Sequence, residues 1–166
     1  VVLRPLNVRT NGSVTAAAEA TDPEGDPITV SYAFTVDGVT VQEGSETTLS
    51  GIDHFDKGQS IQAIATASDG TNESTAESNT VVVLNTPPTA PMVSIEEHEA
   101  GITCVVTEPA NDDDVDPIDY GFVWDVDGVA FTDTSTATYD ADTVPGDALG
   151  FDELWTCTVT PNDGEE

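Results

Sequence analysis

Short runs of alternating apolar and polar residues recur along the chain. In residues 28–36 every second position is apolar, and residues 118–126 follow nearly the same pattern. Successive side chains of a β-strand point to opposite faces, so each run predicts a strand with one face turned toward a core. Helical spacing of apolar residues is absent from the sequence. The apolar positions are Ile28, Val30, Tyr32, Phe34 and Val36 in the first run, and Ile118, Tyr120, Phe122, Trp124 and Val126 in the second.

A tight-turn signal follows each run. The sequence Val-Asp-Gly-Val occupies residues 36–39 and again residues 126–129. The two central positions of a hairpin turn need positive φ, which Asp and Gly tolerate. Several short strands with turn signals at this spacing predict a β-sandwich, with about seven strands in each unit.

The chain contains two copies of one unit. Residues 26–39 align with residues 116–129 without a gap, an offset of 90, and residues 65–70 align with residues 159–164, an offset of 94. The second copy therefore carries four extra residues. Between the copies lies "NTPPTAP", residues 85–91, whose prolines favour a stiff, extended connector. We expect an all-β protein with one domain over residues 1–85 and a second over residues 86–166.

Both cysteines belong to the second copy. Cys104 precedes an Asp-rich loop, Trp124 lies on the next strand and Cys157 on the strand before the final turn. This order resembles the Cys, Trp, Cys arrangement of immunoglobulin-like sandwiches. The two offsets align Cys104 with Val14 and Cys157 with Ala63, and a core pair replaced by another core pair predicts a disulfide between facing sheets, outside the cytosol. The alternative is two unrelated buried thiols. Without nearby histidines, the pair lacks the usual zinc ligand set.

The chain is strongly acidic. It has 32 acidic and 3 basic residues, a formal net charge of −29. This charge repels nucleic-acid phosphates and anionic lipids, so we expect no nucleic-acid partner. No run approaches the roughly 18 apolar residues of a membrane helix, so we expect no membrane insertion in this segment. The opening "VVLRPLNVRT" does not read as a signal peptide, and we expect a mature piece of something larger. Many Asp, Thr and Ser residues and a single lysine suit an extracellular or cell-surface location in salty or calcium-bearing water.

Three stretches resemble a known type of module. They are "TDPEGDPITVSYAFTVDG" (residues 21–38), "NTPPTAPMVSI" (85–95) and "LWTCTVTPNDG" (154–164). They resemble the tandem immunoglobulin-like repeats, cadherin-like in their acidic motifs, of long extracellular surface, adhesin and fibre proteins of bacteria and archaea. The resemblance covers nearly the whole chain and implies two tandem immunoglobulin-like β-sandwich domains doing structural work outside the cell, often stiffened by calcium. The second copy departs from the motif at Val115, where the first has Gly25.

Acidic residues at alternate positions are candidate calcium ligands. Calcium takes six to eight oxygen ligands, and alternate acids in an irregular loop can aim several at one point. In ordinary sandwich order, the acidic loop and the final Asp-Gly turn of the second copy face the connector and the first copy, so we expect calcium at this junction. The alternative is that Asp-rich loops are simply favoured turns. The candidate ligands are Asp22, Glu24, Asp26, Asp37, Asp53, Asp56, Asp69, Asp112, Asp114, Asp116 and Asp163.

We expect no enzymatic activity. His54 and His98 are the only histidines, and neither has a counterpart in the other copy. A pair of carboxylates would need a groove with aromatic platforms to act on sugars. The strand pattern places several of the ten aromatic residues (two Trp, three Tyr, five Phe) in cores.

Two sites match the acceptor pattern for N-glycosylation. Asn11 and Asn72 each begin an Asn-x-Ser sequence, and both fall at predicted turns that a modifying enzyme can reach. We treat them as candidate glycosylation sites.

The second copy stops before any equivalent of "NTVVVLN", residues 79–85, and the chain opens with "VVLRP", which resembles "VVLNTPP", residues 82–88. A sandwich without its last strand exposes apolar core and unpaired backbone groups, which invites strand addition. One interpretation is a single period of a longer array. Another is a head-to-tail filament in which Val1–Leu3 complete the second copy of the next subunit. A third is that the strand is disordered or removed.

Two functions therefore compete. One is a structural module of a filament, stalk or surface array, whose partners are copies of itself or adjacent repeats. The other is an adhesin module that binds a glycan or surface protein through its end loops. Adhesion predicts an exposed aromatic residue or a concave patch confined to one copy, whereas the structural function predicts ion sites at junctions.

Overall fold

A computed structural model describes residues 1–132, 136–138 and 141–165. These residues divide into two compact units, Val1–Thr86 and Pro87–Glu166. The structure is 52% strand and 4% helix, which confirms the all-β prediction. Neither short helix in the described ranges has the length or apolar content of a membrane-spanning helix.

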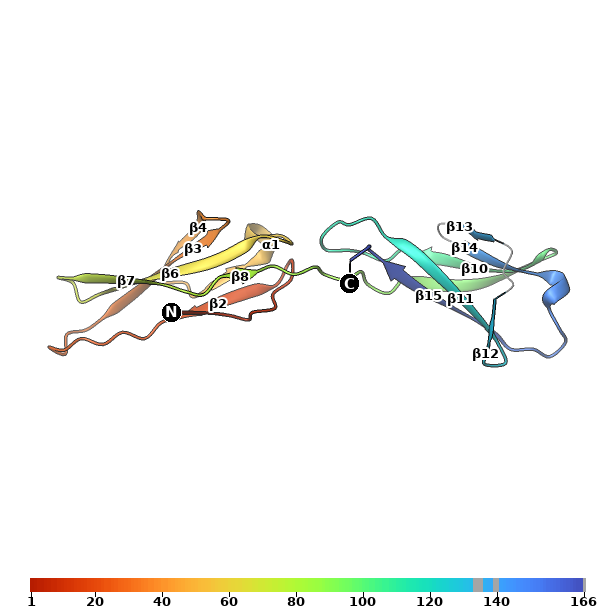
Figure 1. Cartoon of the computed structure of the whole chain (residues 1–166), viewed down its shortest axis with the longest axis horizontal. Coiled ribbons are helices and arrows are strands. Elements are labelled where there is room, and N and C mark those ends of the chain that lie inside the picture. The colour runs from red at the N-terminus through yellow and green to blue at the C-terminus, as the bar shows by residue number, and fades with distance from the viewer. Residues whose placement is uncertain (133–135, 139–140, 166) are drawn as a thin grey trace. The chain divides into compact units, whose positions relative to one another are not determined.

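The first unit has two antiparallel sheets (Figure 1). One has the strand order β1-β2-β5, and the other has the order β4-β3-β6-β7, with β8 also pairing with β6. The strands are β1 (Val2–Arg4), β2 (Ser13–Ala17), β3 (Thr29–Val36), β4 (Val39–Gly44), β5 (Thr48–Ser50), β6 (Ser60–Ser68), β7 (Glu73–Glu77) and β8 (Val81–Val82). A one-turn helix, α1 (Gly51–His54), follows β5.

The core of the first unit lies between these sheets. Leu3, Val14 and Leu49 come from one sheet, Phe34 and Ile61 from the other, and all five are fully buried. Burying a side chain of this size contributes about 1.5 to 3 kcal/mol. The alternation predicted for residues 28–36 therefore gives the inward face correctly.

The second unit also has two sheets, with strand orders β13-β14-β10-β9 and β12-β11-β15. The strands are β9 (Met92–His98), β10 (Gly101–Glu108), β11 (Asp119–Val126), β12 (Val129–Phe131), β13 (Thr136–Thr138), β14 (Ala141–Pro145) and β15 (Trp155–Asn162). A short 3-10 helix, η1 (Gly146–Ala148), follows β14. The buried cluster is smaller and is formed by Ile102, Cys104, Trp124 and Val144.

Equivalent strands recur in the two units at the offsets expected from the sequence. The bounds of β3 and β11 differ by 90 at both ends, and β6 and β15 end at positions that differ by 94. The strand pairing agrees: Phe34 lies opposite Ala63, and Trp124 lies opposite Cys157. The described strands number eight in the first unit and seven in the second, against about seven expected for each.

The predicted disulfide is present. Cys104 on β10 bonds to Cys157 on β15, with their Cα atoms 6.3 Å apart, and thereby joins the two sheets of the second unit. The aligned residues of the first unit, Val14 and Ala63, are both fully buried. The same core position is therefore filled by apolar contact in one unit and by a covalent bond in the other.

The opening segment, Val1–Arg4, packs within its own unit, whereas the filament hypothesis expects it to complete another copy. Residues Val2–Arg4 pair with β2, and Leu3 is fully buried in the first unit. The Leu3 amide donates to Asn79 Oδ1 (2.9 Å), and Asn79 Nδ2 donates to the Leu3 carbonyl (3.2 Å). Because these residues complete their own core, Val1–Leu3 do not serve as a donor strand for another copy in this structure.

Candidate metal site

The loop between β10 and β11 gathers three carboxylates. Asp112, Asp114 and Asp116 each offer an oxygen, and these oxygens lie within 4.8 Å of one another. Two ligands of one calcium ion lie at most about 5 Å apart, since each calcium–oxygen distance is about 2.3 to 2.6 Å. The cluster can therefore hold a metal ion.

The backbone of the loop is organised around Asp112. Its Oδ1 accepts hydrogen bonds from the amides of Asp114 (2.7 Å) and Asp116 (3.5 Å), and its carbonyl accepts one from Val115 (3.2 Å). An Asp side chain that binds amides further along its own loop forms a local turn, which places the three acids on one side. The tight turn therefore brings the acids together.

One oxygen of Asp112 is left over. The residue is only 8% exposed, and its Oδ2 is buried without a hydrogen-bond partner. Burying a carboxylate oxygen without compensation is costly, and buried charges are usually paired or bound to metals. The second unit contains no Lys or Arg that could neutralise this cluster. A cation is the partner that this oxygen and its two neighbouring carboxylates favour.

Neighbouring residues hold the loop in place. The Thr89 amide donates to the Asn111 carbonyl (2.9 Å), and the Asn111 amide donates to Thr89 Oγ1 (2.8 Å). The Ala110 amide donates to the hydroxyl of Tyr120 (2.8 Å). Sequence reasoning missed Thr89 because a threonine in a connector gives no signal. Tyr120 could have been found, since it replaces Val30 of the first unit.

The aligned loop of the first unit has the same turn but no such cluster. The Gly25 amide donates to the Asp22 carbonyl (3.3 Å), and the Asp26 amide donates to Asp22 Oδ1 (3.0 Å). The side chains of Glu24 and Asp26 are exposed, and the structure does not bring them together with Asp22 as it does their counterparts. The same spacing of acids therefore gives a metal-binding geometry in only one unit.

The departure from the motif at Val115 does not change the turn. Val115 has φ of 63°, and Gly25, which it replaces, has φ of 84°. The side chain of Val115 is 88% exposed, so packing of this side chain does not force the backbone into positive φ. A β-branched residue at positive φ is strained, and the surrounding hydrogen bonds of Asp112 keep it there.

Other candidate ligands stabilise turns instead. Asp37 Oδ1 accepts from the Ser60 amide (2.9 Å) and its Oδ2 from Gln59 Nε2 (3.0 Å). Asp163 Oδ1 accepts from the Glu165 amide (2.9 Å). Each uses its carboxylate as the alternative interpretation expects. Neither joins a group of three ligands in the described part of the chain.

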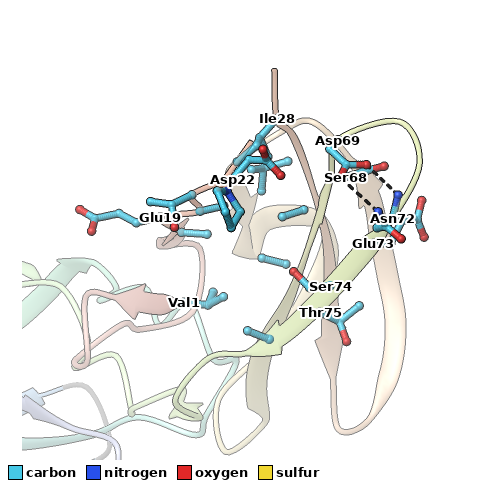
Figure 2. Close-up of a pocket in the computed structure, with 18 of the residues that line it drawn as sticks. Val1, Glu19, Asp22, Ile28, Ser68, Asp69, Asn72, Glu73, Ser74 and Thr75 are labelled. Carbon is cyan, nitrogen blue, oxygen red and sulfur yellow. Dashed lines mark hydrogen bonds between the residues drawn. The ribbon is translucent and has the colours of Figure 1, made fainter. Parts of the chain in front are cut away.

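Asp69 also binds its own turn. Its Oδ1 accepts from the amides of Asn72 (2.7 Å) and Thr71 (2.6 Å), which hold the pKa of Asp69 below its ordinary value because they favour the charged form. Figure 2 shows this carboxylate directed at Asn72, beside a groove that Asp22 also lines. Asp69 therefore acts as a turn former in this structure.

The two remaining candidate ligands are in the segment after β5. Asp53 lies on α1 and is exposed, and Asp56 is exposed just after that helix. Neither belongs to a cluster of three ligands among the residues described.

The candidate glycosylation sites are accessible. Asn11 and Asn72 are both exposed, and both lie outside the strands. Glycosylation needs an accessible asparagine, and both residues meet this condition. Glycosylation at Asn11 and Asn72 stays a prediction.

Comparison with known proteins does not assign the chain. No known protein family matches the sequence, and no curated protein matches it. The function must therefore be argued from the geometry.

Proposed function

We propose that this chain is a structural module of an extracellular filament, stalk or surface array. It consists of two tandem immunoglobulin-like β-sandwiches, assembles head to tail with copies of itself or adjacent repeats, and is stiffened by calcium. The observation that carries the proposal is the repetition of one β-unit with equivalent strand pairs. Repeated units of this kind are typical of arrays, in which each unit contacts mainly its neighbours.

The sheet orders support the immunoglobulin-like assignment. In the first unit, β1, β2 and β5 form one sheet, and β3 and β6 lie at the centre of the other. Immunoglobulin-like sandwiches divide their strands between two antiparallel sheets in a similar way. A disulfide between the sheets is also found in many members of this class, and such bonds persist in oxidising surroundings outside the cytosol.

The acidic loop supports calcium as the ion. Its donor set consists of carboxylate oxygens, which hard cations such as calcium prefer, and it contains no sulfur or imidazole. A calcium ion bound there would offset two of the three negative charges that repel one another within 4.8 Å. A loop cross-linked by the ion would resist bending, which is the mechanical function that we propose. The position of the ion at a junction between modules stays a prediction.

Calcium titration of the 166-residue chain tests this proposal. Calcium should bind to the native state and raise the melting temperature, and a chelator should reverse the effect. Binding to the native state alone adds about 2.7 kcal/mol when free calcium is 100 times the dissociation constant. Fluorescence is a suitable readout, because both tryptophans, Trp124 and Trp155, belong to the second unit.

A matched pair of variants separates the cluster from general charge effects. Asp112→Asn keeps an acceptor for the loop amides but removes one charge from the cluster, so it should abolish at least nine-tenths of the calcium affinity. Asp22→Asn changes the aligned residue of the first unit and should leave binding unchanged. An unaltered melting temperature with and without chelator would contradict the calcium proposal, as would equal losses in both variants.

An adhesin is the second candidate, and one observation favours it. The second unit has a groove lined by Trp155, and Phe151, which follows the lining residue Gly150 in the sequence, is 93% exposed. The aligned residues of the first unit are Ile61, which is buried, and Lys57. An exposed aromatic residue confined to one copy is what adhesion through a glycan or surface protein predicts.

A further inference from the structure

One edge of the first unit is free of acidic residues. Residues 1–18 and 78–86 contain no Asp or Glu, although 32 of the chain's 166 residues are acidic. These two segments lie side by side: Arg9 and Leu84 form a parallel β-bridge, and the Leu84 amide donates to the Val8 carbonyl (2.9 Å). The missing acids are therefore a property of one surface and not of one stretch of sequence.

The outer side of this edge carries arginine and apolar side chains. Arg4 on β1 and Arg9 are both exposed. Arg9 Nη1 donates to the Asn85 carbonyl, which holds the guanidinium beside the second segment. Val82 and Leu84 are 49% and 43% exposed and share the outer face, because successive residues of an extended segment alternate between faces. We call Arg4, Arg9, Val82 and Leu84 the basic edge.

The charges of the two arginines are not compensated by nearby acids. Neither Arg4 nor Arg9 forms an ion pair within the described ranges. The third base, Lys57, precedes Gly58, whose amide donates to the Val83 carbonyl (2.9 Å), so it lies on the other flank of the same segment. All three bases of a chain with a net charge of −29 therefore border one strand segment. Such a surface attracts negatively charged partners, which the rest of the protein repels.

The aligned segment of the second unit has the opposite charge. Residues 96–99, Glu-Glu-His-Glu, form the end of β9 and the start of its turn into β10, and all four side chains are exposed. At the offset of 90, Glu99 takes the position of Arg9. Within the segment, His98 Nε2 lies 3.7 Å from Glu96 Oε2. We call residues 96–99 the acidic hairpin.

The positions of these glutamates face outward even where a further strand lies beside them. In the first unit the residues aligned with the three glutamates are Leu6, Asn7 and Arg9, and all three are exposed. Residues 81–84 lie next to them, since Leu84 bridges Arg9. The charge of the acidic hairpin therefore lies at positions that a neighbouring strand leaves accessible.

We propose that the basic edge of one copy binds the acidic hairpin of a second copy of this chain. The guanidinium groups of Arg4 and Arg9 pair with the carboxylates of Glu97 and Glu99, and the apolar side chains of the basic edge are removed from water. Arginine presents a planar fork of N–H donors, which suits two-point contact with a carboxylate. This inference rests on the proposed head-to-tail assembly and names the surfaces that join.

The two surfaces belong to different units, so the contact is heterologous and can repeat from copy to copy. Two copies of net charge −29 repel each other at long range. At an ionic strength of about 0.15 M the Debye length is about 8 Å, so distant charges are screened and the local pairs decide. Association should therefore be strongest near this ionic strength, and weaker both in dilute buffer and at about 1 M salt.

Charge reversal in the intact 166-residue chain tests the contact, with self-association measured by sedimentation equilibrium in calcium-containing buffer. We expect the wild type to self-associate. Arg9→Glu and Glu99→Arg should each weaken association about tenfold, because like charges then face each other. The double variant exchanges the two charges and should associate at least threefold more tightly than either single variant. An equimolar mixture of the single variants should show the same recovery.

Glu108→Arg is the matched control. Glu108 is exposed at the end of β10 away from the acidic hairpin, and its replacement changes the net charge as much as Glu99→Arg does. Association should stay within about twofold of the wild type, since a distant surface charge contributes little. Circular dichroism confirms that each variant folds, and the double variant guards against a loss of association that comes only from destabilising the first unit.

Three results would overturn the inference: a wild type that stays monomeric, equal effects of Glu99→Arg and Glu108→Arg, or a double variant no tighter than the single ones. An anionic polysaccharide that binds a monomeric wild type but not Arg9→Glu would overturn it in favour of adhesion. The calcium response reports on a different loop. A monomeric wild type that calcium still stabilises refutes this contact alone, and charge-dependent association without a calcium response refutes the calcium proposal alone.

Discussion

Asp residues have several different functions in this chain, although the sequence presents them alike. Asp37 and Asp69 bind backbone amides of nearby turns, whereas Asp112, Asp114 and Asp116 gather their oxygens within 4.8 Å. Alternate spacing indicates that acids share a loop, but not where each side chain points. The sequence could therefore predict which acids are candidate ligands. Only the three-dimensional structure distinguishes the acids that can bind a metal ion from those that stabilise turns.

Strain at Val115 gives a test at the scale of one residue. Replacing it by glycine removes a Cβ that is unfavourable at φ of 63°. The relief of about 1 to 2 kcal/mol exceeds the entropic cost of glycine, about 0.5 to 1 kcal/mol. We therefore expect Val115→Gly to stabilise the second unit by about 0.5 to 1 kcal/mol in urea unfolding followed by tryptophan fluorescence.

The reciprocal change in the first unit is the control. Gly25→Val introduces the same strain at φ of 84° and recovers the entropic cost of glycine, so it should destabilise that unit by about 0.5 to 1 kcal/mol. If Val115→Gly lowers the stability of the second unit when both proteins are measured in calcium-free buffer, the valine is favourable at this position. That result would contradict the claim that Val115 is strained.

At the scale of strands, the sequence is informative because period-2 alternation fixes the inward face. It placed Phe34 and Trp124 in the cores and, through the repeat, paired Cys104 with Cys157. Alternation does not name the partner of a strand, which is why donation of Val1–Leu3 to another copy was one of the three interpretations of the missing last strand. Its burial at Leu3 depends on contacts far away in sequence, such as the one with Asn79.

The first unit shows which apolar residues can replace the two cysteines of the disulfide. The double variant Cys104→Val with Cys157→Ala installs the pair that the first unit uses at the same position. The bond closes a loop with a sequence separation of 53, for which chain entropy predicts about 4 kcal/mol. Since valine and alanine restore some packing, we expect a net loss of about 2 to 4 kcal/mol in the second unit.

Circular dichroism should show unchanged strand content in this variant, and the unfolding of the first unit should not shift. Unfolding of the wild type in a reducing agent should show a comparable loss of stability. An undiminished stability of the second unit would mean that the disulfide adds little to packing that already holds the sheets together.

At the scale of the whole molecule, the repeat is the feature from which function is argued. The same hydrogen bonds hold aligned turns in both units: Asp37 binds the amide of Ser60, and Asp127 binds that of Leu154 at 3.0 Å. These equivalent hydrogen bonds show that the two units share the same turn structure. The two units differ where the second carries the acidic cluster, through which we propose that the module binds calcium.

Imaging of the native assembly tests the central claim most directly. Material isolated from its source in calcium-containing buffer and viewed by electron cryo-microscopy should show threads with a regular axial repeat that holds one pair of units per 166 residues. Isolated particles without an axial repeat, at native concentration and with calcium present, would contradict the account.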